Sequence, residues 1–510
     1  MTCKTAVSQC QLYGAEMPPN RYHVNRPLRL GSWRRRLQPG VRLLATLILM
    51  GGATVGSLRA ALVTTQPANA IRVTSAALNG MVVPGPNSTA AWFEWGTSSS
   101  YGNTTGTTNL SAGSRVVPVR RVLPGLSAGH VYHFRLVASN LLGVVYGADQ
   151  QFTLGGSVVV WGNGGFGQIP APSDLTNAVA IGGGGYHCAA LRNDGTIAAW
   201  GGDAHGQTDV PADLTNVIAI AVGQAHTLAL LPDGTVRAWG AGELFGPPAT
   251  LDGGQSMVPA GLLNVVQIAA GADHSLALKA DGTVAAWGSA AIYSDVWSDL
   301  GQSLVPPGLS NVVQIAGGDD YCLALKADGT VAFWGYSFNG ENSVPSGLLG
   351  VVSIAAGWYH GLALKADHTL VAWGYDGFLE TNVPPKLSNV ASMAGGGFDS
   401  LALQADGTVA GWGSDSSGQV NGAYGLTNVV AIAAGYDFTL ALQSSTPIET
   451  PPVTLSLLPF GSQLQLTWSG GTLQSASNVA GPYTDVADVT SPLTFTPSEA
   501  RQFYRVRTQQ

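Results

Sequence analysis

A Trp-Gly pair that returns at nearly constant spacing constrains this chain more than any other sequence feature. It recurs seven times, at intervals of 39, 39, 48, 47, 39 and 39 residues, with its tryptophans at Trp161, Trp200, Trp239, Trp287, Trp334, Trp373 and Trp412. The unit before most copies is seen whole in residues 264–288, NVVQIAAGADHSLALKADGTVAAWG. Such a period is typical of arrays in which each unit buries its apolar face against the next.

The repeated unit predicts three short strands. VVQIAAG is a buried strand, HSLALK alternates like a second strand, and AAWG ends a third. An Asp-Gly pair between the last two predicts a two-residue hairpin turn, and Asp367-His368 replaces it once. Seven such units predict a β-propeller. A lone strand at residues 158–161 and an incomplete last unit ending at 439–442 predict that the two ends pair and close the ring, which removes an exposed edge.

At these residues the array, 156–445, resembles the regulator of chromosome condensation repeat family. The Trp-Gly-x-x-x-x-Gly-Gln…Val-Pro connector, seen in residues 162–168, 201–211 and 413–419, is similar to that of the compact secreted bacterial type. The known member of that type is a propeller-fold β-lactamase inhibitor protein. The resemblance is specific for fold and says far less about function.

The segments before the array indicate export and a second β-domain. Within the leader, 1–70, an uncharged and mostly apolar run at 43–58 follows basic residues, as in a signal peptide, and is too short to span a bilayer. Cleavage is expected after Ala70 or nearer Ala60. Residues 71–154 resemble a fibronectin type III β-sandwich, which implies that the Tyr132 hydroxyl bonds upstream backbone.

Residues 446–510 form a Pro/Thr linker and a small β-domain, with strands expected at 464–468 and 503–507. The predicted fold class is therefore all-β: a seven-bladed β-propeller flanked by a fibronectin type III-like β-sandwich and a small C-terminal β-domain. We expect a bacterial protein that is secreted or lies on the cell surface, is monomeric, and has no stable membrane span after signal cleavage.

Charge excludes one class of partner. Nine of the 23 Lys and Arg residues and one of the 30 acidic residues lie in the leader, which leaves 14 basic and 29 acidic residues in 71–510. An acidic body repels a phosphate backbone, so we expect no nucleic acid partner. Cys188 and Cys322 occupy one column in different units, too far apart for a disulfide.

The histidines do not indicate a metal site. His187, His226, His274 and His360 share one column of the repeat, and one per unit disperses them too widely to ligate one ion. We expect each imidazole to bond neighbouring backbone, and each Trp of Trp-Gly to pack between units. No sequence motif indicates a nucleophile, a phosphate loop or a metal site. The sequence therefore predicts no enzyme, no catalytic residue, no metal and no cofactor.

Variable loop positions predict a binding face instead. The loop before the histidine column and the connector after Trp-Gly should share one end of the ring, with the Asp-Gly turns at the other. Large rings on such loops are typical of binding surfaces, and inserted loops often carry recognition. The candidate ligand-binding residues are Tyr186, Asp273, Asp319, Asp320, Trp358, Tyr359, Phe398 and Tyr436, with Phe245, Tyr293 and Trp297 in the two longest connectors. Packing of these rings against neighbouring loops is the alternative.

Four functions remain at this point. The first is a non-catalytic binding or adhesion protein that holds an extracellular protein or glycan on this face. The second is an inhibitor of a secreted or periplasmic enzyme such as a β-lactamase, as the resemblance implies. The third is nucleotide exchange on a small GTPase. The fourth is a lyase or glycan hydrolase with carboxylates at the propeller axis.

Overall fold

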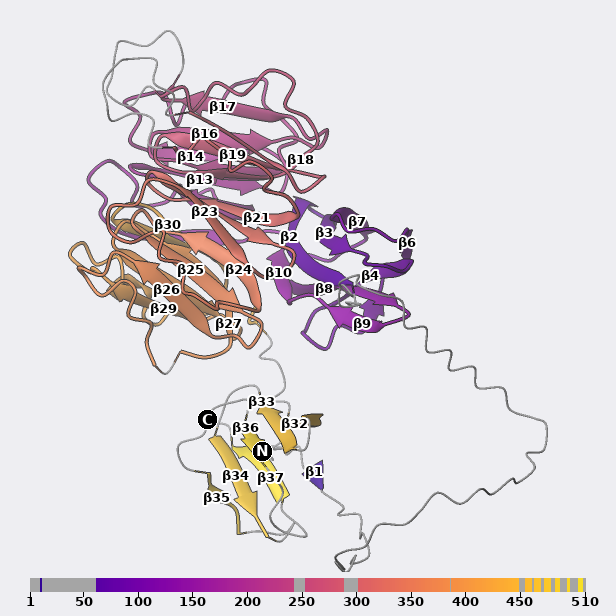
Figure 1. The fold of residues 1–510 in the computed structure, drawn as a ribbon. Helices are drawn as coiled ribbons and strands as arrows, with labels where there is room; N and C mark the ends of the chain where they lie inside the picture. The colour runs from indigo at the N-terminus through magenta and orange to yellow at the C-terminus, as the bar shows by residue number, and fades with distance from the viewer. Residues whose placement is uncertain are drawn as a thin grey trace, which may run out of the picture. The chain divides into compact units, whose positions relative to one another are not determined.

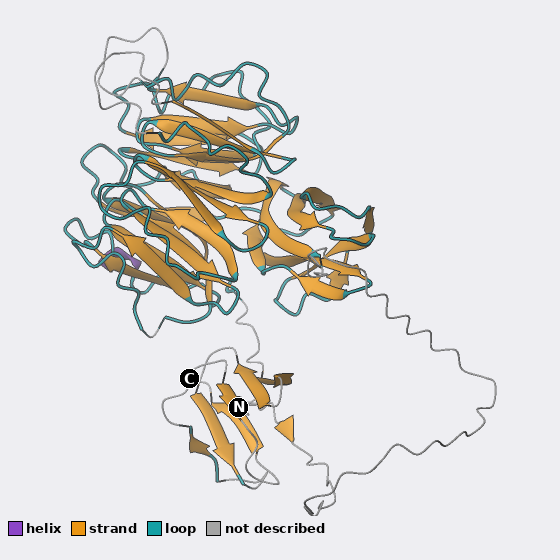
Figure 2. Cartoon of the chain, in the orientation of Figure 1, coloured by secondary structure: helices purple, strands orange, loops and turns teal. Residues whose placement is uncertain are grey.

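The computed structural model describes residues 10–11, 61–242, 253–288, 301–385 and 387–448, and the strands between 455 and 507. The chain divides into two compact units, Arg59–Pro452 and a second that joins Met1–Leu58 to Val453–Gln510. Strands dominate both (Figures 1 and 2), and the described residues contain a single short 3-10 helix, η1 (Asn421–Ala423). The expected all-β class is confirmed.

Seven three-stranded antiparallel sheets follow one another in the larger unit, and we number them repeat sheets 1 to 7. Sheet 1 is β12 (Ala178–Gly183), β13 (His187–Arg192) and β14 (Ile197–Gly201); sheet 2 is β15 (Ala219–Val222), β16 (His226–Leu230) and β17 (Val236–Gly240); sheet 3 is β18 (Val265–Ala270), β19 (His274–Lys279) and β20 (Val284–Gly288); sheet 4 is β21 (Val312–Gly317), β22 (Tyr321–Lys326) and β23 (Val331–Gly335). Sheet 5 is β24 (Val351–Ala356), β25 (His360–Lys365) and β26 (Leu370–Gly374); sheet 6 is β27 (Val390–Gly395), β28 (Asp399–Gln404) and β29 (Val409–Gly413); sheet 7 is β30 (Val429–Ala434), β31 (Phe438–Gln443) and β11 (Ser157–Gly162).

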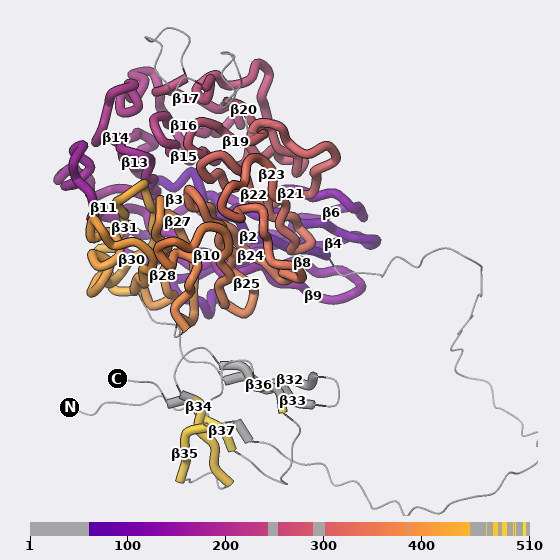
Figure 3. The backbone as a smooth tube through the Cα atoms, turned by 60° about the vertical axis from the view of Figure 1, so that its left-hand side comes forward, coloured from indigo at the N-terminus to yellow at the C-terminus, as the bar shows by residue number. Residues whose placement is uncertain are grey.

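The sheets form a closed β-propeller. The first strand of each sheet contacts the first strand of the next, and β12 of sheet 1 contacts β30 of sheet 7. Sheet 7 is completed by β11, which precedes sheet 1 in the chain and pairs with β31 from Ser157–Gln443 to Gly162–Phe438; Figure 3 shows β11 beside β31 and β30. The predicted pairing of the two ends of the array is therefore confirmed.

The Asp-Gly turns are longer than the predicted two-residue type. In sheet 3 the Lys279 N–H donates to the Thr283 carbonyl, and only Gly282, with φ +77°, enters the left-handed region. The Asp281 carboxylate accepts hydrogen bonds from the Thr283 N–H and hydroxyl, at 3.0 and 2.6 Å. This side-chain bond holds the aspartate in an ordinary turn conformation, so a single glycine satisfies the turn.

Two sheets upstream of the propeller face each other as a β-sandwich. One is β2 (Leu62–Arg72), β3 (Ser75–Val83) and β7 (Val117–Pro124); the other is β10 (Gln150–Thr153), β8 (Val131–Asn140), β4 (Thr89–Gly96) and β5 (Asn103–Thr104), with β6 (Thr108–Leu110) on β4 and β9 (Gly143–Tyr146) on β8. Phe93, Phe134 and Leu136 are fully buried between them. The Tyr132 hydroxyl donates to the Ser127 carbonyl and accepts from the Ser127 N–H, at 3.1 and 2.9 Å, so the expected bond to upstream backbone is present.

The sandwich begins earlier than expected and is joined to the propeller. Its first strand, β2, starts at Leu62, inside the segment assigned to the leader, so cleavage after Ala70 would remove most of β2. The Gln66 side-chain amide donates to the carbonyl of Val313, at the start of β21. Asn311 bonds the 114–116 loop of the sandwich through both side-chain atoms. These contacts lie at the Asp-Gly end of the propeller, which the sandwich therefore occupies.

The smaller unit contains two sheets. One is β1 (Cys10–Gln11), β37 (Phe503–Arg507), β34 (Thr472–Ala476) and β35 (Thr484–Asp485); the other is β32 (Leu455–Phe460), β33 (Gln463–Trp468) and β36 (Leu493–Phe495). The strands expected at 464–468 and 503–507 are confirmed. The leader run at 43–58 lies outside the described residues, and among the described residues no helix has the length and hydropathy to cross a membrane.

Candidate functional site

Seven loops, each between the first and second strands of a repeat sheet, are tied together by backbone hydrogen bonds, and we call this arrangement the loop ring. In each link an N–H of one loop donates to a carbonyl of the loop beside it. The links run from Gly185 to Gln224, Gln224 to Ala272, Ala272 to Gly318, Asp319 to Trp358, Trp358 to Gly396, Gly397 to Tyr436 and Tyr436 to Gly184, at 3.0–3.2 Å. Both neighbours therefore hold the backbone of each loop in place.

A narrow cavity of about 130 Å³ runs along the propeller axis at the loop ring. All seven sheets line it, mostly with glycine and alanine, and Gln224 and Trp358 are its largest lining side chains. Small residues are required because the strands converge: a Cβ at Gly183 would lie 2.8 Å from the backbone nitrogen of Gly435. The cavity offers little room for a substrate.

Six rings from sheets 5, 6 and 7 form one continuous cluster on the loop ring and the connectors beside it. Trp358 meets Tyr436 edge to face with centroids 4.5 Å apart, and Tyr359 stacks on Phe398 at 5.3 Å. Phe378 packs against Phe398 at 5.1 Å. The members of this aromatic cluster are Trp358, Tyr359, Tyr375, Phe378, Phe398 and Tyr436. The rings therefore pack on neighbouring loops and also remain partly exposed, Phe378 by 48%.

An acidic cluster of Asp273, Asp319 and Asp320 adjoins these rings. Burial and the charges of the other two carboxylates raise the pKa of Asp273 to about 7. Burial and the Asp320 charge likewise raise the pKa of Asp319 to about 7, although a hydrogen bond from Tyr359 opposes that shift. These half-buried carboxylates repel one another, so a cation beside them would favour their ionised forms. Within the described residues no group of three or more His, Cys, Asp or Glu is placed to hold a metal ion.

The histidine column links neighbouring sheets through side-chain hydrogen bonds that the sequence did not predict. Each Nε2 bonds a side chain of the next sheet, at the position directly after that sheet's own residue of the column. The pairs are His187 with Thr227, His226 with Ser275, His274 with Cys322 and His360 with Ser400, at 2.8–3.2 Å. Burial lowers the pKa of His226 to about 3 and those of the other three to about 4, so all four are neutral. The expected bond to neighbouring backbone is present for two of these imidazoles, His187 with Gln224 and His274 with Asp319, and the Nε2 bonds to a hydroxyl or thiol of the next sheet were not predicted.

Each of these imidazoles lies against a glycine three residues earlier, which explains the repeated Gly-x-x-His. A Cβ at Gly271 would lie 2.1 Å from Cε1 of His274 and 2.5 Å from the Gly318 carbonyl oxygen. We therefore expect Gly271→Ala to lower the free energy of unfolding by about 2 kcal/mol through overpacking. Urea titration measures this. Gly106→Ala is the control, because Gly106 has nothing within 4 Å of that position; equal effects of the two changes would contradict the packing role.

The structure places the predicted site residues as follows. Trp358, Tyr359, Phe398 and Tyr436 meet in the aromatic cluster. Asp273, Asp319 and Asp320 form the acidic cluster, and Tyr186 packs separately on Phe166, with centroids 4.7 Å apart. Phe245, Tyr293 and Trp297 lie outside the described residues.

Sequence reasoning named rings only in the two longest connectors and missed those of the shorter ones, among them Phe166, Tyr336, Phe338, Tyr375 and Phe378. Their signal was available, since each lies two to five residues after the tryptophan of a Trp-Gly pair. Contacts of Tyr375 and Phe378 with Phe398 confirm that the connectors and the loop ring share one end of the propeller.

Basic side chains gather at the other end of the propeller. Five of the six Lys and Arg residues of 156–445 lie within four residues of the Asp-Gly or Asp-His turns: Arg192, Arg237, Lys279, Lys326 and Lys365. The strand His274–Lys279 separates the two ends, a distance of roughly 17 Å at the usual rise per residue. The sixth, Lys386, lies outside the described residues. Each of the five pairs with an aspartate, whereas the loops of the loop ring contain no Lys or Arg beside their carboxylates.

Comparison with known proteins finds a known repeat in three stretches of the array. The model of the regulator of chromosome condensation (RCC1) repeat matches residues 217–244, 265–290 and 351–378. Among solved structures, Prp20p of Saccharomyces cerevisiae is 21% identical, with a TM-score of 0.47 over 59% of this chain and 92% of that one. Human WBSCR16 is 20% identical, with a TM-score of 0.44 over 56% and 98%. No curated protein matches the chain in sequence.

Proposed function

The chain carries RCC1 repeats in a β-propeller, and we propose that it is a non-catalytic binding protein whose loop ring holds a basic segment of a partner protein. The observation that carries the proposal is the contact between the aromatic and acidic clusters, in which Tyr359 packs on Phe398 and hydrogen-bonds Asp319. Aromatic rings supply most of the energy at protein interfaces. Guanidinium and ammonium groups also bind over such rings, and carboxylates beside them add charge complementarity.

The sandwich supports this choice of surface. Its hydrogen bonds through Gln66 and Asn311 occupy the Asp-Gly end, so the loop ring is the end left for a partner.

We propose further that the seven repeat sheets are seven blades, that residues 62–153 form a fibronectin type III domain, and that the leader exports the protein. Two facing antiparallel sheets and the Tyr132 hydrogen bond support the second assignment. The charged run before residues 43–58 supports the third.

Peptide binding tests the proposed surface. We expect a fluorescent (Arg-Ser)6 peptide to bind the full chain more tightly than (Glu-Ser)6, with an affinity that falls as salt rises. The double change Trp358→Ala and Tyr359→Ala should weaken binding about tenfold or more, because it removes the centre of the aromatic cluster. Fluorescence anisotropy measures both.

Tyr424→Ala serves as the control, since Tyr424 is an exposed ring, 67% accessible, outside the aromatic cluster. Equal binding of the two peptides, or full affinity in the double variant, would remove the loop ring as the site. Binding of neutral oligosaccharides that depends on Trp358 would replace the protein partner with a glycan.

A further inference from the structure

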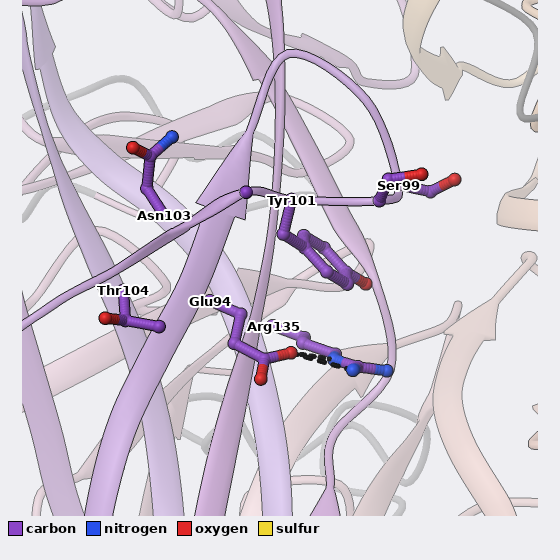
Figure 4. Close-up of a pocket in the computed structure, with 8 residues that line it drawn as sticks. Glu94, Ser99, Tyr101, Asn103, Thr104 and Arg135 are labelled. Atoms are coloured by element: carbon purple, nitrogen blue, oxygen red, sulfur yellow. Dashed lines mark hydrogen bonds and ion pairs between the residues drawn. The ribbon is translucent and has the colours of Figure 1, made fainter.

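A second hollow lies at an edge of the sandwich, where β4, β5 and β8 meet (Figure 4). Its volume is about 480 Å³, within the range of small-molecule sites. The hydrogen bonds between sandwich and propeller come from β2 and the 114–116 loop, so this pocket takes no part in joining the two. Its lining is Glu94, Ser99, Ser100, Tyr101, Gly102, Asn103, Thr104 and Arg135.

A fixed ion pair forms the floor of the pocket. Arg135 donates to the same oxygen of Glu94 from Nη2 and Nε, at 2.7 and 2.8 Å, and Figure 4 shows the two side chains meeting beside Tyr101. The guanidinium carbon also lies 4.7 Å from the ring centroid of Tyr101 and 4.2 Å from that of Tyr146. Its position is therefore set from three sides, while N–H groups that Glu94 does not use remain as donors.

The loop over this floor is also held in place. The Tyr101 N–H donates to the Ser98 carbonyl, and the Tyr101 carbonyl packs so closely on Gly96 that a Cβ there would lie 1.7 Å from its oxygen. The Tyr101 hydroxyl bonds Asp149, which in turn contacts Nδ1 of His133 at 2.8 Å. The Tyr101 hydroxyl and the backbone of this loop are thus ordered before a ligand arrives, which lowers the entropic cost of binding.

The chemistry of the lining selects the ligand class. Five of the eight lining residues carry a hydroxyl or an amide, groups that both donate and accept hydrogen bonds. The charge of Arg135 is cancelled by Glu94, and Asp149 lies behind Tyr101, so an anion finds no unpaired cation here. A cation in turn meets a guanidinium. We propose that this pocket binds a neutral saccharide, whose many hydroxyls match alternating donors and acceptors around a neutral ion pair.

Ligand-observed NMR on the full chain tests the proposal, with maltohexaose, cellohexaose and xylohexaose as neutral probes and hexagalacturonate as the anionic one. We expect at least one neutral hexaose to bind below about 1 mM, with the anionic probe weaker. The double change Ser99→Ala and Thr104→Ala removes two lining hydroxyls, Thr104 being the cross-strand partner of Glu94, and keeps the ion pair. It should weaken binding about tenfold or more, as two lost hydrogen bonds imply.

Two controls separate this site from the rest of the molecule. Ser111→Ala removes an exposed hydroxyl of the sandwich outside the pocket and should leave affinity unchanged. Trp358→Ala with Tyr359→Ala should also leave it unchanged, because the loop ring is a different surface. The proposal is overturned if no neutral hexaose binds, if hexagalacturonate binds most tightly, or if the Ser99 and Thr104 variant keeps full affinity.

Discussion

Replacing Trp161 with alanine is expected to lower the free energy of unfolding by about 4 kcal/mol, the range for a buried tryptophan. Trp161 is 9% exposed and packs with Leu401 and Val409. Its indole N–H donates to the Gln419 carbonyl at 2.8 Å. Every tryptophan of a Trp-Gly pair makes this bond to the connector of the preceding sheet, as Trp334 does to Gln302. Trp161 differs because it lies on β11, the strand that closes the ring.

Two matched variants distinguish the role of Trp161 in holding β11 in the ring from its role as a buried side chain. Trp334→Ala removes an equivalent ring in the middle of the array, so it should lower stability by a similar amount without freeing β11. In the Trp161 variant the amides of β11 should lose protection from hydrogen exchange ahead of those of β31, because local opening then requires only one strand to leave. Trp161→Phe keeps an aromatic ring but loses the indole N–H, so it should lower the free energy of unfolding by about 1 kcal/mol. Equal loss of protection in β11 and β31 of the alanine variant would contradict the closing role.

The architecture was predictable because its signal is repeated. A strand that is uncertain in one repeat is supported by the aligned residues of the others. The incomplete repeats at the two ends indicated the pairing of β11 with β31. The shared end of the loops and connectors followed from strand parity alone. The β2 strand was missed because Pro67 and Asn69 interrupt its pattern, and two register shifts accommodate them in the sheet.

The details of the site depended on contacts that a repeat pattern does not encode. The partner of His187 is Thr227, which belongs to the next repeat and to the neighbouring column of the alignment. Alignment of the repeats does not show which residues of different columns contact each other. The aromatic cluster was predicted in part because its loop rings occupy aligned positions. Tyr375 and Phe378 occupy variable connectors and join it only through packing on Phe398.

The acidic cluster should make the free energy of unfolding depend on pH. The pKa of Asp273 is raised from 3.8 to about 7, first by burial and then by Asp319 and Asp320. Between about pH 4 and 7 the folded chain therefore keeps a proton that the unfolded chain has released, and the Asp273 contribution to stability falls as pH rises through this window. Each unit of pH changes it by at most about 1.4 kcal/mol.

We expect Asp273→Asn to raise the free energy of unfolding by about 3 kcal/mol at pH 8 and to match the wild type below pH 4. Urea titration at a series of pH values measures the difference. Asp281→Asn is the control from the same sheet: hydrogen bonds from Thr283 lower the pKa of Asp281, so its loss should reduce stability at pH 8. A gain for both variants, or none for Asp273→Asn, would contradict the assignment.

A carboxylate that opposes folding calls for a compensating role, and cation binding supplies one. Loss of the Asp273 charge should weaken binding of the (Arg-Ser)6 peptide while the propeller becomes more stable, because the field that destabilises the free protein is the field that attracts the ligand. The Asp281 control should leave peptide affinity unchanged, since its turn lies at the opposite end. If Asp273→Asn instead gains stability and keeps full affinity, the acidic cluster is a packing feature and the aromatic cluster alone carries recognition.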